Sequence, residues 1–202
     1  MTTPAHRLCL GAVIMIAAAA LPPNDVLACA CCSDPGDRFE RTEPLADYTR
    51  EVLLAVRFDP AAQLYADAGF PETVKGVIAP NAGAYRVAWS VADNRLLLSA
   101  TDPAKAVGTI SIALPRRIST LAFDPQNASE RPNGPILMRI WRLDGDAELT
   151  GIFAAKQKRA KAQLILQGSG NRCATNTDFK SWTLELKARD VAFKLLGKTA
   201  TK

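Results

Sequence analysis

The strongest constraint on the fold of this chain is an alternation of apolar and polar residues that recurs along its length. The alternation is clearest in four stretches, 52–58, 85–91, 109–114 and 182–187. A period of two places successive side chains on opposite faces of an extended strand, so each stretch is expected to have one buried and one wet face. This pattern is typical of antiparallel sheets with one buried and one solvated face. The sequence therefore predicts a mainly β protein.

Weaker apolar runs predict further strands at 73–79, 95–100, 118–123, 135–143, 148–154, 163–167 and 191–196. Asp144-Gly145-Asp146 separates two of these runs, so we expect 135–154 to form a hairpin. Short helices are expected at 60–68, 101–106 and 154–162. Because short turns separate consecutive strands, we expect an antiparallel β-barrel or barrel-like sheet of about 8–10 strands, with a β-sandwich as the alternative.

The first residues have the features of a secretory signal. His6 and Arg7 precede an apolar run over 8–21, which Pro22 ends. The run is shorter than the roughly 20 residues that a membrane-spanning helix needs. Small residues at 26 and 28 suit a signal peptidase, so we expect cleavage after Ala28 and export to the periplasm or cell envelope.

Three segments follow from this interpretation. Residues 1–28 are expected to be a signal peptide, 29–48 a cysteine-containing N-terminal segment, and 49–202 a single β-rich domain. The sequence Val26-Leu27-Ala28-Cys29 also resembles a lipoprotein signal. In that alternative Cys29 is acylated and holds the protein at a membrane; without acylation we expect no membrane association.

Cleavage after Ala28 also removes His6, the only histidine of the chain. A mature chain without imidazole has no Ser-His-Asp or Cys-His machinery and no zinc site built on histidine. The carboxylates, lysines, tyrosines and cysteines that remain match no catalytic motif. We therefore predict that the protein is not an enzyme, with no catalytic residues, no metal ligands and no cofactor.

Four cysteines remain after this cleavage: Cys29, Cys31, Cys32 and Cys173. An even number in an exported chain favours disulfides, because the compartment is oxidising. A bridge between the adjacent Cys31 and Cys32 is strained, so we expect at least one N-terminal cysteine to pair with Cys173. The alternative is that these thiols bind a soft metal such as Cu(I).

Charge and aromatic residues indicate the kind of partner. The chain has 25 basic and 20 acidic residues, and its densest basic run, 156–161, contains no aromatic residue. Nucleic-acid binding usually interleaves the two, so we expect no nucleic-acid partner. An anionic envelope surface is a candidate partner instead. Trp89, Trp141 and Trp182 fall on predicted strands, where they pack in the core or, in a barrel with a cavity, line a ligand site.

These observations together favour an exported, non-catalytic β protein that binds a small apolar ligand or an envelope component. Two alternatives from other classes stay open. One is a thiol-based metal-handling protein that uses the cluster of Cys29, Cys31 and Cys32. The other is an envelope lipoprotein acylated at Cys29.

Overall fold

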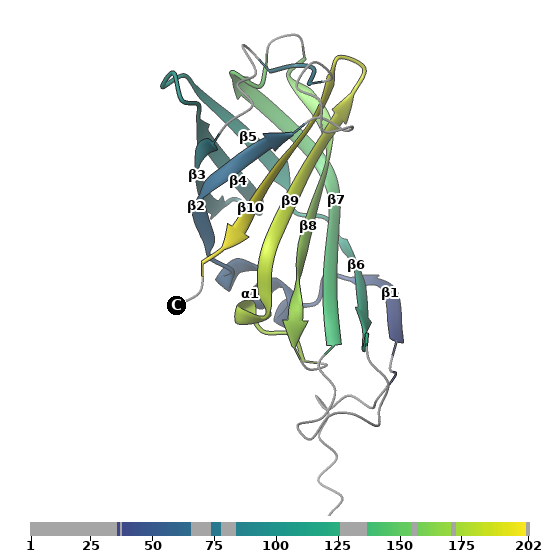
Figure 1. Cartoon of the computed structure of the whole chain (residues 1–202). Helices are drawn as coiled ribbons and strands as arrows, with labels where there is room; N and C mark the ends of the chain where they lie inside the picture. The colour runs from purple at the N-terminus through teal and green to yellow at the C-terminus, as the bar shows by residue number, and fades with distance from the viewer. Residues whose placement is uncertain are drawn as a thin grey trace, which may run out of the picture.

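The computed structural model of the chain describes residues 36, 38–65, 74–77, 84–125, 137–154, 157–170 and 173–200. Within these residues it contains ten strands and one α-helix (Figure 1). In chain order they are β1 (Arg38–Pro44), α1 (Asp47–Ala55), β2 (Phe58–Tyr65), β3 (Ala84–Ala92), β4 (Arg95–Thr101), β5 (Val107–Ala113), β6 (Arg117–Phe123), β7 (Leu137–Gly151), β8 (Arg159–Gly170), β9 (Phe179–Ala188) and β10 (Val191–Thr199). A 3₁₀ turn, η3 (Asn176–Asp178), precedes β9.

The strands close into an antiparallel barrel. The ring of eight strands runs β2-β3-β4-β5-β7-β8-β9-β10, and β10 pairs with β2 to complete it. Within this ring β7 also pairs with β8 along almost the whole length of both strands. The predicted barrel is therefore confirmed, and the alternative of a sandwich is not what forms.

The strand β7 is long enough to pair with two strands on one edge. Its C-terminal half pairs with β5, where Ile112 lies opposite Ala147, and its N-terminal half pairs with β6, where Ser119 lies opposite Arg142. Between β5 and β6 lies Pro115, which has no N–H for a strand ladder. Beyond this break β6 pairs with β1 instead of β4. The pair β6–β1 thus leaves the barrel as a two-stranded extension at its lower end (Figure 1).

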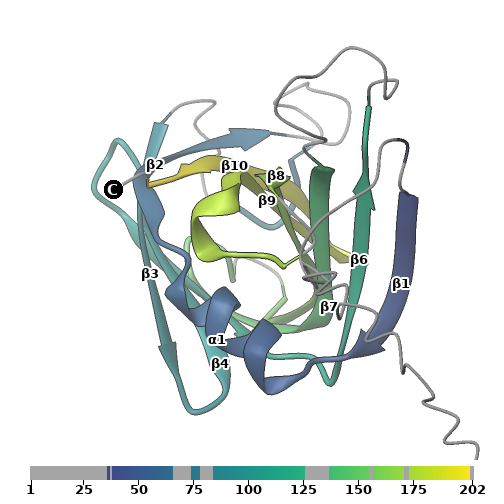
Figure 2. The same cartoon turned by 90° about the horizontal axis from the view of Figure 1, so that it is seen from below.

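The helix α1 lies across this lower end, as the view from below shows (Figure 2). The expected strand at 52–58 is wrong over its first part, because 52–55 belong to α1. Val52, Leu53 and Val56 are all buried. They share one side of a helix, whereas in a strand Leu53 would point away from Val52 and Val56. The amide of Asn176 donates a hydrogen bond to the carbonyl oxygen of Ala55, 3.2 Å away, which ties η3 to the end of the helix.

The hairpin expected over 135–154 is also wrong, because β7 passes through Asp144-Gly145-Asp146 without a turn. A Cβ atom at Gly145 would lie 2.9 Å from the carbonyl oxygen of Ala113. The glycine therefore permits a close approach of the end of β5 to β7. A glycine inside a strand often marks such an approach and not only a turn.

The three expected helices are wrong wherever the structure describes their residues. Residues 60–65 belong to β2, 159–162 belong to β8, and the chain after Thr101 makes a turn. The strands expected at 85–91, 95–100, 118–123, 163–167, 182–187 and 191–196 are confirmed. Of the expected strand 73–79, the described residues 74–77 contribute one bridge, between Lys75 and Ala192.

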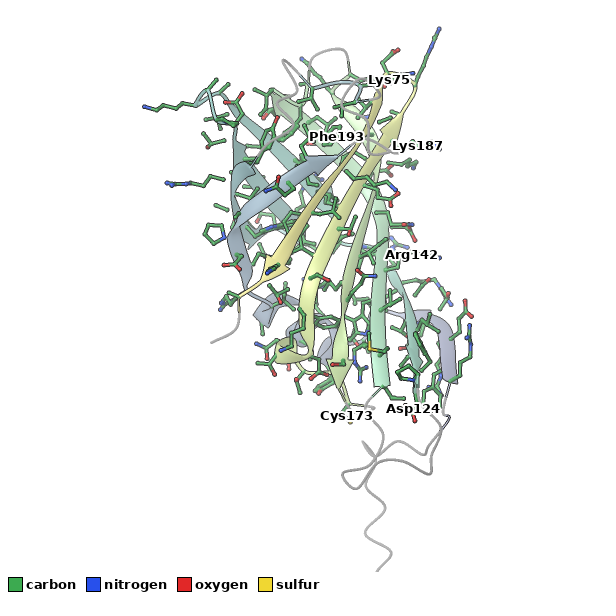
Figure 3. All side chains as sticks on the ribbon, viewed as in Figure 1. Lys75, Asp124, Arg142, Cys173, Lys187 and Phe193 are labelled. Carbon is green, nitrogen blue, oxygen red and sulfur yellow. The ribbon has the colours of Figure 1, made fainter. Side chains whose placement is uncertain are left out.

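Apolar side chains fill the barrel. Leu98, Ile110, Leu164, Leu184 and Leu195 are completely buried on its inward faces. Towards the upper end of the barrel, where Figure 3 labels Phe193, the ring of Phe193 stacks on the ring of Phe153 with the two centroids 5.4 Å apart. Among the described helices none is long and apolar enough to cross a membrane.

Candidate functional site

A cavity of about 540 Å³ opens at the lower end of the structure. Residues of β1, β6, the N-terminal half of β7, the start of α1 and the segment before η3 form its walls. We call it the lower pocket. Small-molecule sites in proteins usually measure roughly 300–1,000 Å³ and combine apolar walls with a few polar groups. Phe39, Leu137 and Trp141 supply apolar wall, and Arg139 is a charged group among them.

The register of the sheet explains how an arginine fits there. The odd-numbered residues of β7 face inward over 137–149, and Arg139 lies among them. Its neighbours across the strands are Ala122 on β6 and Gly168 on β8. Both are small, so they leave room for a long side chain. Gly168 also lets the backbone of Asp178 come close, because a Cβ at this position would overlap the carbonyl oxygen of Asp178.

Arg139 is a buried cation with incomplete hydrogen bonding. It is only 5% exposed, and its Nε lies 3.5 Å from Oδ2 of Asp178. Nε and Nη2 nevertheless have no hydrogen-bond partner within the described structure. Burial lowers the pKa of Arg139, while the nearby carboxylate of Asp178 raises it. A guanidinium stays protonated in proteins, so a positive charge remains here at physiological pH.

The carboxylate of Asp178 is already engaged by its own turn. Oδ2 accepts the backbone N–H of Thr175 at 3.0 Å, and Oδ1 accepts the hydroxyl of Thr175 at 2.7 Å. The contact between the backbone N–H of Thr175 and the carboxylate of Asp178 is one half of a capping box at the start of η3. The ion pair with Arg139 is therefore an additional contact of a carboxylate that has other partners.

The remaining walls of the lower pocket combine aromatic and polar groups. Trp141 is buried and packs against Phe179, with ring centroids 4.9 Å apart. The hydroxyl of Tyr48 donates to the carbonyl oxygen of Ala174 at 2.8 Å, so α1 is fixed to the segment before η3. The guanidinium of Arg41 lies 5.6 Å from the ring centroid of Phe39. The pocket thus offers apolar surface beside one buried positive charge.

The three tryptophans expected at a ligand site lie in different surroundings. Trp141 lines the lower pocket, whereas Trp89 lines a second cavity of about 340 Å³ beside α1. Trp89 stacks on Phe58 at 4.4 Å and meets the ring of Trp182 edge-on at 5.2 Å. Trp182 is 1% exposed and donates from Nε1 to the carbonyl oxygen of Lys198. The structure therefore brings Trp89 and Trp182 together in the core and places Trp141 at the pocket.

Sequence reasoning missed Arg139, although the sequence contains a signal for it. On the inward face of β7 every residue is apolar or glycine except this arginine. A charge on a buried face is expensive unless a partner or a function explains it. This signal becomes visible once β7 is recognised as one strand.

Cys173 also lines the lower pocket and lies at the lower end of the structure (Figure 3). The other candidate cysteines, Cys29, Cys31 and Cys32, lie outside the described residues, as does the expected cleavage site after Ala28. Within the described part of the chain, no three His, Cys, Asp or Glu side chains gather as a metal site.

Comparison of the chain with protein-family models, curated proteins and solved structures found no match.

Proposed function

We propose that this protein is an exported, non-catalytic β-barrel protein that binds a small, largely apolar ligand in the lower pocket. The observation that carries the proposal is the cavity of about 540 Å³, walled in part by Phe39, Leu137 and Trp141. Apolar surface transferred from water to such a wall contributes roughly 25 cal/mol per Å². A ligand with an apolar body therefore gains free energy by entering this pocket.

Tyr48, which lines the lower pocket, and Asp178, which lies beside Arg139, are both held in structural hydrogen bonds, and this supports binding rather than catalysis. Asp178 is held by Thr175, and the hydroxyl of Tyr48 is donated to a backbone carbonyl. A general base needs to reach the proton that it abstracts. Groups fixed in structural hydrogen bonds are better suited to shaping a site than to moving protons.

An envelope surface receives less support as the partner. Lys161, at the end of the basic run 156–161, forms an ion pair with Asp146 on the neighbouring strand β7. Asp144, Asp146 and Glu185 lie in the same surface region as Lys161 and Lys187. Charges of both signs are therefore mixed there, which weakens attraction to a uniformly anionic surface.

Filling the lower pocket tests the proposal. Thr120 lines the pocket and lies opposite Trp141. We expect the neutral fluorescent probe N-phenyl-1-naphthylamine to bind the protein at one site and to bind Thr120→Phe at least ten-fold more weakly. Ser119→Phe is the matched control, because it adds the same ring to the other face of β6. Absence of saturable probe binding to the unaltered protein, or equal binding to both variants, contradicts the proposal.

Export and the cysteine pairing are proposals that intact mass measures together. The even number of cysteines after cleavage supports a link between Cys173 and one of Cys29, Cys31 and Cys32. We expect the exported protein to begin at Cys29 and to weigh four hydrogens less than its reduced form. A mass raised by a diacylglycerol and an acyl chain would instead identify the lipoprotein acylated at Cys29. Open thiols with a bound metal would identify the thiol-based metal-handling protein.

A further inference from the structure

The most unusual group in the lower pocket is the buried side chain of Arg139. Its Nε carries one N–H and its Nη2 carries two, and none of these has an acceptor within the described residues. Leaving a buried donor without a partner costs free energy, and more so when the group is charged. Native structures rarely keep such a group unless a function explains it.

We propose that Arg139 binds the acid group of the ligand, so that the lower pocket selects an amphipathic carboxylate with its tail against Leu137 and Trp141. This inference rests on the proposed function and specifies its ligand. It derives from the placement of one buried cation within an apolar wall.

The two unpaired nitrogens suit a carboxylate in particular. Nε and Nη2 share one edge of the planar guanidinium, and this edge can donate to both oxygens of one carboxylate at once. Solvent does not reach these two nitrogens in the structure. Arg139 lines the pocket, so binding requires its terminal side-chain torsions to turn this edge from Asp178 towards the cavity.

The charges around the pocket favour a singly charged acid. Asp178 places a negative charge 3.5 Å from Nε of Arg139. Arg41 and Glu43 lie on the wall formed by β1 and carry opposite charges. A dianion such as a phosphate monoester would double both its attraction to Arg139 and its repulsion by Asp178. Its second charge would meet no second buried cation among the described lining residues, and burying an unpaired charge is costly. Tyr48 also lines the pocket, and its phenol adds no positive charge there.

A matched pair of ligands tests this inference. Decanoate and decan-1-ol have the same chain length and differ in their head groups. We expect calorimetric titration of the protein to give a dissociation constant at least ten-fold lower for decanoate. In Arg139→Met we expect this preference to disappear. Arg142→Met is the control, because Arg142 lies on the same strand with its side chain 51% exposed on the outer face. This control should keep the preference.

The outcomes separate the inference from the proposed function. If neither ligand binds the unaltered protein, the proposed function fails. If both bind equally, the lower pocket is a ligand site but Arg139 is not its anchor, and the inference is overturned. Decyl phosphate at pH 8 gives a test that needs no variant: it should bind at least ten-fold more weakly than decanoate, and tighter binding would overturn the choice of a carboxylate.

Discussion

Replacing Arg139 by methionine should leave the stability of the ligand-free protein nearly unchanged. At 3.5 Å from Asp178, an effective dielectric constant of about 20 gives an attraction of about 4–5 kcal/mol. The desolvation of a buried ion costs several kcal/mol and opposes this attraction. Methionine removes both the attraction to Asp178 and the desolvation cost of the guanidinium, and it keeps a long apolar side chain. We therefore expect the free energy of unfolding to change by no more than about 1 kcal/mol.

Asp178 should tolerate this change, because it keeps its two hydrogen bonds from Thr175. The pH of the measurement should matter little. The pKa of Arg139 is lowered by burial in the folded state, so the folded state binds this proton less tightly than the unfolded state does. The lowered pKa therefore reduces the free energy of unfolding at every pH below the range where arginine titrates. This reduction becomes smaller only as the pH rises into that range. The effect of Arg139→Met should therefore be the same between about pH 6 and 9.

Equilibrium unfolding in urea without reductant measures the effect. Leu164→Ala serves as the reference for a structural loss, because Leu164 is completely buried; it should cost about 2–5 kcal/mol. A loss of about 3–5 kcal/mol in Arg139→Met would refute the reasoning, since that is the cost of breaking a structural buried ion pair. Arg139 would then be explained by its contact with Asp178, and the pocket would need no anionic ligand.

Three further substitutions test the fold around the site by thermal or urea unfolding. Gly145→Val should cost about 1–3 kcal/mol, because its Cβ would meet the carbonyl oxygen of Ala113 at 2.9 Å; a neutral effect would show that β5 does not approach β7 there. Leu53→Ala should cost about 2–5 kcal/mol, since Leu53 is 2% exposed and lies in α1. Leu54→Ala should cost less, because Leu54 is only half-buried. Asn176→Ala removes the hydrogen bond to Ala55 and should cost about 1 kcal/mol; an unchanged midpoint would mean that η3 does not hold the helix.

The barrel itself could be predicted from the sequence because its inward faces follow a strict period of two. Tyr85 and Val87 on β3, like Leu184 and Leu186 on β9, are buried as the alternation requires. The helix α1 could not be predicted in the same way. Val52 and Val56 share a face in a strand and also in a helix, so a short apolar run fits both periods. The position of this segment across the lower end of the barrel decides between them.

The lower pocket depends on information that a single sequence does not contain. Arg139 can be recognised as a charge on an apolar strand face, but its small neighbours Ala122 and Gly168 are known only once the register is known. Register follows from which strands pair, and the sequence suggested a hairpin where β7 runs straight. Asp178 reaches the site from a turn between β8 and β9. The pocket therefore arises from tertiary pairing and not from a local motif.

The central claim is that a ligand binds beside Trp141 in the lower pocket. Proton–nitrogen NMR resolves the indole N–H signals of the three tryptophans, and Trp141→Phe assigns one of them. On addition of decanoate the signal of Trp141 should move, while that of Trp182, which donates to Lys198 in the core, should stay. Movement of the Trp89 and Trp182 signals with that of Trp141 unchanged would place the ligand elsewhere and contradict the account.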